Sequence, residues 1–375
     1  MKNLQYRHHV IRGVLFLLLL LQAVSCQNYQ EIQTNTLRYS SLLRMDEKDG
    51  CVVVEVLDVW HPGKILQRYF LVDKDSVVPN DLTEGVLVRT PLERGVLATS
   101  VHASLLVDLG DISGIAALCD TEYLKSDTLI SSLSKGDILD LGSSMSPSLE
   151  KMSTIQADGL LLSPFENSGH GAFSLLDVPI IECLDYMENS PLGRAEWMLF
   201  YGELFGLREE ADSLFREVET EYNRLCGLLS EVGRRPSLFC DLKQGSAWYV
   251  PGGNSYIGRM FADAGADYLF SDYEQSGSVP CSFETVYAKV RNADYWLIKY
   301  AAATDLTYQS VASDYSLYTH FDAWENRRIY HCNTFYSSFF EEIPFHPERM
   351  LRDLIGIFHP SVLGSVENRY YKPLK

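Results

Sequence analysis

Beyond residue 26 the sequence has no uninterrupted apolar run long enough to cross a membrane, and it is short of positive charge. The formal charge is -18, from 32 Lys and Arg against 50 Asp and Glu. A chain this acidic is repelled by nucleic acid and by anionic membrane surfaces, which disfavours both as partners. We therefore expect a body that folds in water, and 375 residues are enough for two domains.

The sequence also lacks the short motifs of common enzymes and metal sites. It has no Gly-x-Ser-x-Gly elbow, no Gly-rich phosphate loop, no His-Glu-x-x-His and no Cys-x-x-Cys pair among its eight cysteines. Adjacent acidic pairs such as Glu341-Glu342 diverge on a helix and serve poorly as an acid/base couple. We predict no catalytic residues, no bound metal and no cofactor. Buried free thiols are expected at Cys119 and Cys183.

The N-terminus has the pattern of an export signal. Three cations precede the apolar stretch Val14–Val24, which is too short to span a bilayer comfortably. Small residues then lead to Cys26, in a pattern that resembles a bacterial lipoprotein box. The pattern predicts a signal peptide over residues 1–25, lipidation of Cys26, and a location in the periplasm or at the cell surface. Ala23 stands where Leu is commonest, so ordinary secretion is the alternative.

The rest of the chain divides into four segments by its hydrophobic pattern. Residues 26–50 are polar and predict a tether. Residues 51–187 begin with a β-hairpin around Pro62-Gly63 and continue as short apolar strands alternating with helices, which predicts a first α/β lobe. Residues 188–232 predict a long helical connection that opens at Ser190-Pro191, and residues 233–375 repeat the strand and helix rhythm as a second lobe. A single doubly wound domain is the alternative.

The two predicted lobes share a landmark. Ser148-Leu149-Glu150 and Ser282-Phe283-Glu284 each follow a turn and precede a helix, an Ala-Asp pair and a strand. The two glutamates thus occupy equivalent places. Each could simply complement the dipole of its helix, but the matched pair favours contact with a partner of two-fold geometry.

Six segments follow one another in a recognisable order and spacing: Arg94–His102, Ser148–Glu150, Pro236–Asp241, Trp248–Ser255, Ala264–Ala266 and Phe283-Glu284. Together they resemble periplasmic binding proteins of ABC importers for iron siderophores, haem or vitamin B12. The resemblance runs from about Leu92 to Leu363, and the hairpin and the closing His346–Pro360 segment look like Bacteroidetes-type lipoprotein members.

This resemblance implies a mechanism and partners. In that family the lobes are joined by one stiff helix, the protein acts as a monomer, and a glutamate on each lobe docks onto the permease, which works with its ATPase. The matching positions are Glu150 and Glu284. The implied cargo is a ferric siderophore, haem or cobalamin. Because a continuous helix resists a wide hinge, we expect only slight closure of the lobes on the ligand. Two alternatives remain, a chelatase-like enzyme of two-lobe architecture and a surface lipoprotein that stores ligand without a permease.

We expect the ligand at the carboxyl ends of the strands, where loops of both lobes face each other. Aromatic, hydroxyl and small residues in these loops suit a bulky, partly apolar chelate. Trp248 and Tyr249 are the first choice, with structural packing as the alternative, and His170 is the candidate axial ligand for haem or a corrinoid. For His102 a helix-capping or core position is the alternative. The predicted ligand-binding residues are Ser100, His102, Ser144, Met145, His170, Trp248, Tyr249, Asn254 and Tyr336.

Overall fold

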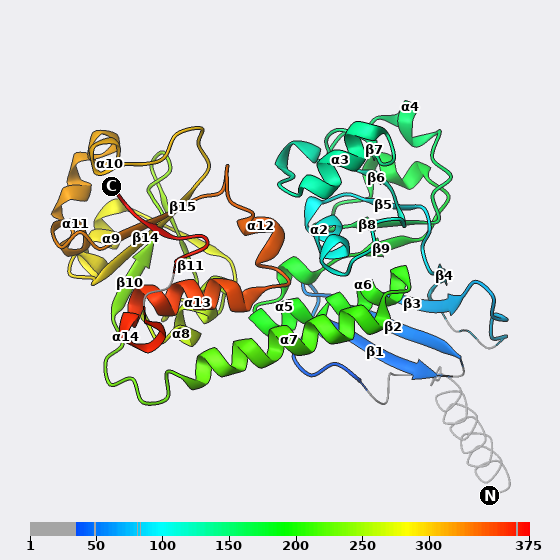
Figure 1. The fold of residues 1–375 in the computed structure, drawn as a ribbon, viewed down its shortest axis with the longest axis horizontal. Coiled ribbons are helices and arrows are strands. Elements are labelled where there is room, and N and C mark those ends of the chain that lie inside the picture. The colour runs from blue at the N-terminus through cyan, green and yellow to red at the C-terminus, as the bar shows by residue number, and fades with distance from the viewer. Residues whose placement is uncertain (1–34, 49, 81, 83, 365–366) are drawn as a thin grey trace, which may run out of the picture.

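The computed structural model describes residues 35–48, 50–80, 82, 84–364 and 367–375. The predicted signal peptide, Cys26 and the first part of the predicted tether lie outside these residues. Two α/β lobes lie side by side, joined along one side by helices (Figure 1). Within the described part of the chain, no helix is both long and apolar enough to cross a membrane.

The first lobe contains a five-stranded sheet in which every strand is parallel to its neighbours. Its strand order is β7-β6-β5-β8-β9, so the winding reverses between β5 and β8. Short strands such as β5 are buried on both faces, which explains their wholly apolar sequence. The strands are β5 (Gly95–Leu97), β6 (Ile115–Leu118), β7 (Leu139–Asp140), β8 (Gly159–Leu162) and β9 (Ile180–Glu182). The helices are α2 (Ser100–Asp108), α3 (Asp127–Lys135) and α4 (Leu149–Met152), with 3-10 turns at Thr121–Tyr123, Gly171–Leu175 and Asp185–Met187.

The predicted hairpin forms two strands of a separate four-stranded sheet. Four strands pair in the order β1-β2-β3-β4, with β3 and β4 parallel and the others antiparallel. The predicted tether is wrong for Leu43–Lys48, which forms β1. Only Leu43 and Met45 point inward, so the segment looks polar in sequence. The strands are β1 (Leu43–Lys48), β2 (Cys51–Leu57), β3 (Ile65–Asp73) and β4 (Val86–Thr90).

Two buried glutamates fix the chain just before β1. Glu196 accepts hydrogen bonds from the backbone N–H groups of Arg38, Tyr39 and Ser40, each at 2.8 Å. Glu188 accepts from the N–H of Leu42 at 2.9 Å and from the hydroxyl of Ser40. We call residues 38–42 the N-terminal strap. Burial raises the pKa of Glu196, and the strap amides supply the partners that its buried carboxylate requires.

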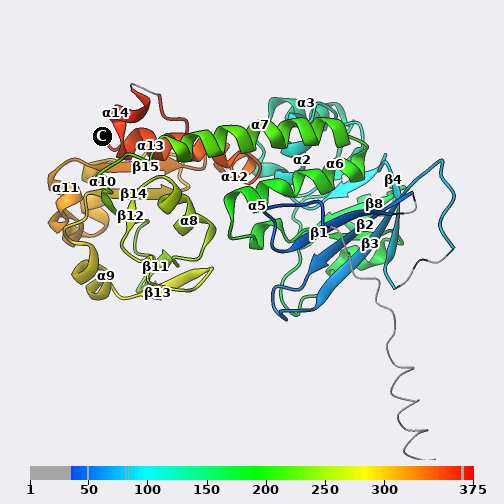
Figure 2. The same ribbon diagram turned by 90° about the horizontal axis from the view of Figure 1, so that it is seen from below.

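The connection between the lobes is three helices rather than one. They are α5 (Pro191–Glu196), α6 (Met198–Phe205) and α7 (Arg208–Gly227). Gly206, with φ of 70°, ends α6 in the left-handed conformation. The 20 residues of α7 make a rod of about 30 Å that bridges the lobes, so the predicted long joining helix is confirmed, although it ends at Gly227. Helix α13 runs beside it (Figure 2), and Arg352 pairs with Glu221 at 2.6 Å.

The second lobe has its own mostly parallel sheet, in the order β12-β10-β14-β15-β16, with only β16 antiparallel. A separate antiparallel ribbon pairs β11 with β13. The strands are β10 (Ser237–Cys240), β11 (Trp248–Pro251), β12 (Asp267–Tyr268), β13 (Ser278–Cys281), β14 (Tyr295–Tyr300), β15 (Ile329–Asn333) and β16 (Lys372–Pro373). The helices are α8 (Tyr256–Asp263), α9 (Phe283–Val290), α10 (Tyr308–Asp314), α11 (Asp322–Glu325), α12 (Phe339–Glu342), α13 (Pro347–Phe358) and α14 (Pro360–Leu363), with a 3-10 turn at Ser316–His320.

Candidate ligand-binding site

Exposed aromatic side chains gather in loops that follow the carboxyl ends of parallel strands. In the first lobe, Tyr123 follows β6 and Phe165 follows β8. In the second lobe, the segment after β15 leaves Phe335, Tyr336 and Phe340 exposed by 49%, 62% and 57%. Exposed rings that lie side by side, as Phe335 and Tyr336 do with centroids 4.9 Å apart, mark an interaction surface, and the crevice at the carboxyl ends of strands is where α/β folds bind ligands. These loops form the candidate site.

The lobes also touch directly beside this site. The backbone N–H of Lys125, in the first lobe, donates to the carboxylate of Glu341 on α12 at 3.0 Å. His346 Nε2 lies 3.1 Å from a carboxylate oxygen of Asp108 on α2. Figure 1 shows α12 next to α2 at the junction of the lobes. A helix rod and a second contact together restrict how far the lobes can separate.

The charge state of this junction follows from its burial. Burial raises the pKa of Glu341, which accepts the amide of Lys125. Burial lowers the pKa of His346, but its hydrogen bonds to Asp108 and Glu348 outweigh that effect and hold the pKa above its usual value. The folded protein therefore favours the charged imidazolium more than the unfolded chain does.

The prediction for Trp248 is wrong. Its side chain is fully buried and its indole N–H donates to the carbonyl oxygen of Cys240 at 3.0 Å. Its ring packs at 6.0 Å from Phe239 and 6.1 Å from Trp296. Side chains alternate along β11, so its neighbour Tyr249 points outward and is exposed.

The prediction for His102 is also wrong, and the core alternative holds. The imidazole is buried, with Nδ1 3.0 Å from the hydroxyl of Thr99 and Nε2 3.1 Å from Asp185. Asp185 accepts a further bond from Tyr201 at 2.9 Å. Burial raises the pKa of Asp185, but the hydrogen bond from His102 helps to bring it below its usual value. Both ring nitrogens of His102 are used inside the lobe, which leaves none for a ligand.

Four predicted residues, one at a helix start and three in loops, are not joined to one another by hydrogen bonds. Ser100 begins α2 directly after β5, at the reversal in strand order. Ser144 donates its backbone N–H to Asp120 at 2.9 Å, and Met145 beside it is exposed. The Asn254 side-chain amide donates to the carbonyl oxygen of Glu274 at 2.9 Å, which ties two loops of the second lobe.

His170 and Tyr336 are both held by hydrogen bonds. His170 Nε2 lies 2.6 Å from a carboxylate oxygen of Glu182, the last residue of β9. Its Nδ1 has no hydrogen-bond partner among the described residues, so a ligand metal would have to approach this nitrogen. The hydroxyl of Tyr336 donates to the carbonyl oxygen of Ala303 at 2.6 Å, which leaves the face of its ring exposed.

Glu150 and Glu284 have matching local structures. Each is exposed, and each is the second residue of a short helix, α4 or α9, capped by a serine. The hydroxyl of Ser148 accepts the N–H of Lys151, and that of Ser282 accepts the N–H of Thr285. The backbone N–H of Glu284 and then the Ser282 hydroxyl lower the pKa of Glu284, so this carboxylate is ionised. Both glutamates are pre-oriented at helix N-termini.

Sequence reasoning missed two cations of the site, Lys125 and Lys299. The ammonium of Lys125 lies 5.5 Å from the ring centroid of Phe335, and that of Lys299 lies 5.5 Å from that of Phe340. A lone lysine after or within a strand has no spacing pattern, and these two meet one aromatic segment only through tertiary folding. No signal in the sequence could have found them.

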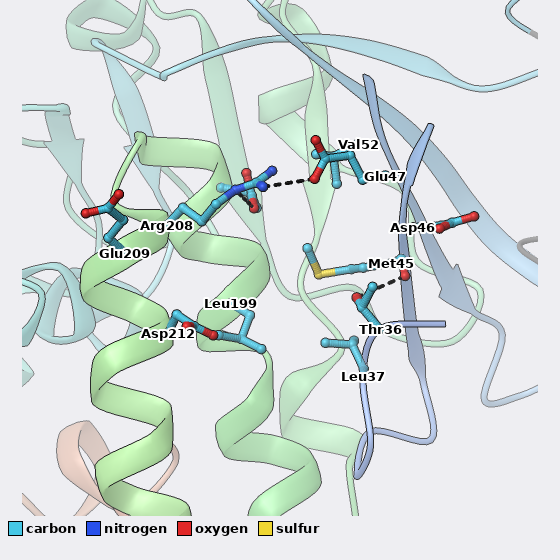
Figure 3. Close-up of a pocket in the computed structure, with 11 residues that line it drawn as sticks. Thr36, Leu37, Met45, Asp46, Glu47, Val52, Leu199, Arg208, Glu209 and Asp212 are labelled. Atoms are coloured by element: carbon cyan, nitrogen blue, oxygen red, sulfur yellow. Dashed lines mark hydrogen bonds and ion pairs between the residues drawn. The ribbon is translucent and has the colours of Figure 1, made fainter. Parts of the chain in front are cut away.

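A separate cavity of about 390 Å³ lies away from the strand ends, between strands β1 and β2 and helices α6 and α7 (Figure 3). Arg208 reaches across it to Glu47 at 3.0 Å and also pairs with Glu203. None of its lining residues belongs to the loops of the candidate site. Among the residues that the structure describes, no three metal-ligating side chains converge here or elsewhere.

Known proteins resemble the chain over most of its length. An uncharacterized lipoprotein of Methanocaldococcus jannaschii is 24% identical over 363 residues, covering 90% of this chain and 85% of the relative. The periplasmic heme-binding protein RhuT from Roseiflexus sp. RS-1 has a TM-score of 0.54 at 19% identity, covering 72% of this chain and 99% of RhuT. Haemophilus influenzae MolA, bound to molybdate, has a TM-score of 0.58 at 13% identity, covering 76% of this chain and 91% of MolA.

The family model for periplasmic binding proteins matches residues 102–334, more than half of the chain. This match agrees with the two lobes, the parallel sheets and the bridging helix, and it confirms the predicted resemblance. It also favours binding over catalysis. The chain belongs to the periplasmic binding protein family.

Proposed function

We propose that this protein is the substrate-binding lipoprotein of an ABC importer. It captures a bulky chelate, a ferric siderophore, haem or cobalamin, between its lobes and delivers it to a permease and its ATPase. The observation that carries the proposal is the set of exposed aromatic rings at the strand ends of both lobes. Lipidation at Cys26 would hold the protein at the membrane as a monomer, with the ligand-binding body in the periplasm or at the cell surface.

The exposed rings favour a bulky chelate over a small ion. RhuT is a haem-binding protein and MolA holds molybdate, so proteins with this fold take ligands of very different size. Rings such as Phe335, Tyr336 and Phe340 offer wide apolar faces, which suit a large chelate and contribute little to an oxyanion. Capture of a bare metal ion would require a cluster of ligating side chains, and the described residues contain none.

Delivery would use the matched glutamates. Glu150 and Glu284 are exposed, belong to different lobes and start equivalent helices. The α7 rod and the contact between the lobes fix the distance between the two glutamates. The pair can therefore bind two arginine-bearing sites on a permease that are separated by the same distance. Exposed charges of this kind contribute little to stability, which is consistent with a role in partner recognition.

Ligand capture is tested by titrating the mature chain with haemin, cyanocobalamin and a ferric hydroxamate, using intrinsic fluorescence. We expect micromolar or tighter binding of at least one chelate, and weaker binding after Tyr336→Ala. Failure to bind any chelate would contradict the proposal.

Docking is tested by pull-down of the cognate permease with Glu150→Lys and Glu284→Lys. We expect each reversal to abolish capture of the permease while ligand affinity and thermal stability stay unchanged. Glu217→Lys, a charge reversal on the exposed face of α7, is the matched control and should leave capture intact. Ligand binding without any capture by the wild-type chain would instead favour a storage lipoprotein.

A further inference from the structure

One aromatic segment at the junction of the lobes is flanked by a cation from each lobe. Lys125, in the loop between β6 and α3, places its ammonium 5.5 Å from the ring centroid of Phe335. Lys299 is on β14 of the other lobe. Its ammonium lies 5.4 Å from the ring centroid of Phe339 and 5.5 Å from that of Phe340. We call this group the lysine–aromatic junction; its members are Lys125, Lys299, Phe335, Tyr336 and Phe340.

The members of the junction are held in place by the fold. The Lys125 backbone is bound to Glu341 at 3.0 Å, and the Tyr336 hydroxyl is bound to Ala303 at 2.6 Å. Phe339, between the exposed rings, is buried and anchors the segment. The ring faces are therefore positioned before a ligand arrives, which lowers the entropy cost of binding.

Neither ammonium group forms a close salt bridge with a carboxylate among the described residues. A buried carboxylate attracts each of them only at longer range, Glu341 for Lys125 and Asp241 for Lys299. Carboxylates at nearby strand ends hold polar groups of their own loops instead: Asp120 accepts the amide of Ser144 at 2.9 Å, and Asp305 accepts the side chain of Asn333 at 3.0 Å.

A third lysine of the same lobe as Lys299 shows the contrast. Lys289 also lies over aromatic rings, 5.4 Å from Phe270 and 5.0 Å from Tyr273, but Asp272 neutralises it at 2.6 Å and 2.7 Å. Half-buried cations that lack such a carboxylate are disposed to accept an anionic group from a ligand.

We propose that the ligand is an anionic chelate that carries rings or flat π-systems. Its carboxylate or catecholate groups pair with Lys125 and Lys299, and its rings stack on Phe335, Tyr336 and Phe340. This inference rests on the proposed function and narrows its ligand class. Because the lysines come from different lobes, a ligand that pairs with both also ties the lobes together.

The test compares three probes on the mature chain: haemin, with two carboxylates; the ferric complex of 2,3-dihydroxybenzoate, an anionic catecholate; and cyanocobalamin, which is neutral overall, with amide side chains and a single phosphodiester. We expect at least one of the two anionic probes to bind at least about tenfold more tightly than cyanocobalamin. The anionic probe that binds more tightly shows whether the natural ligand is a carboxylated macrocycle or a catecholate.

Matched variants locate the effect. Lys125→Gln and Lys299→Gln should each weaken binding of the preferred anionic probe about tenfold, because a charge-assisted bond contributes about that factor. Lys289→Gln, in which an already neutralised lysine is lost, should leave affinity unchanged. In the wild-type chain, affinity should fall as NaCl is raised from about 0.05 to about 0.5 M, a readout that needs no variant.

The outcomes separate this inference from the proposed function. If cyanocobalamin binds as tightly as the anionic probes, or if affinity is independent of salt and the Lys125 and Lys299 variants match Lys289→Gln, the anionic ligand class is wrong while chelate binding stands. If none of the three probes binds, and a ferric hydroxamate does not bind either, both proposals are wrong.

Discussion

The two lobes have the same architecture but cores of different chemistry. The first sheet is packed with aliphatic side chains such as Val96, Leu97 and Leu160. The second is packed around Phe239, Trp248 and Trp296, with rings about 5 to 6 Å apart. Buried rings thus cluster around the second sheet, whereas the core of the first lobe buries fewer of them, such as Phe173, and both lobes expose rings in their loops. Exposure to solvent, and not residue type, therefore distinguishes aromatic side chains that can contact ligand from those that stabilise the core.

The strongest test of this comparison replaces the neighbours Trp248 and Tyr249 in turn. Trp248→Ala should lower the free energy of unfolding by about 3–5 kcal/mol, because it leaves a large cavity among rings. Tyr249→Ala should change it by less than about 1 kcal/mol. Urea unfolding measures both. Equal losses for the two variants would mean that burial does not distinguish these residues.

A second test concerns the first lobe and asks whether Glu196 stabilises the N-terminal strap. Glu196→Ala removes the acceptor of three backbone N–H groups of residues 38–40 and should cost about 2–3 kcal/mol. Glu217→Ala, at an exposed position of α7, should stay within about 0.5 kcal/mol. Amide hydrogen exchange should show faster exchange at Tyr39 and Ser40 in the Glu196 variant only. Unchanged protection there would contradict the role given to this carboxylate.

The contact between the lobes should depend on pH through His346. Its folded pKa is raised, so the stabilisation it provides is complete below the ordinary histidine value and is lost as pH rises through the raised value. The melting temperature should therefore fall over this window in the wild type, and this part of the fall should disappear in His346→Gln. A variant with the same pH profile as the wild type would show that another group is responsible.

The smallest expected effect is the movement of the lobes. The α7 rod and the Lys125–Glu341 bond both oppose wide opening, so ligand binding should change the radius of gyration by about 1 Å or less. Small-angle X-ray scattering with and without ligand measures this change. A shift of several ångströms would mean that the second contact breaks readily.

Much of the fold could be predicted from the sequence because it depends on local patterns. The pattern of short apolar strands between helices predicted the parallel sheets, and the Ser-Pro pair predicted the start of the helical connection. The buried free thiols expected at Cys119 and Cys183 are confirmed. Strand β1 was missed because only two of its side chains face the core, which leaves too weak an alternation to recognise.

The site was harder to predict because side-chain burial is set by tertiary packing. Trp248 and His102 stand next to loops in sequence, yet the fold turns both into the core. Lys125 and Lys299 were missed for the converse reason, since nothing near them in sequence predicts the aromatic segment that they flank. Contacts between distant segments carry the information that the sequence pattern lacks.

The most direct test of the central claim is the position of the ligand metal. Anomalous X-ray scattering from crystals grown with the tightest-binding chelate would locate it without assumptions about the site. We predict a peak between the lobes, beside Phe335, Tyr336 and Phe340. A peak elsewhere, such as in the cavity crossed by Arg208, would contradict the account.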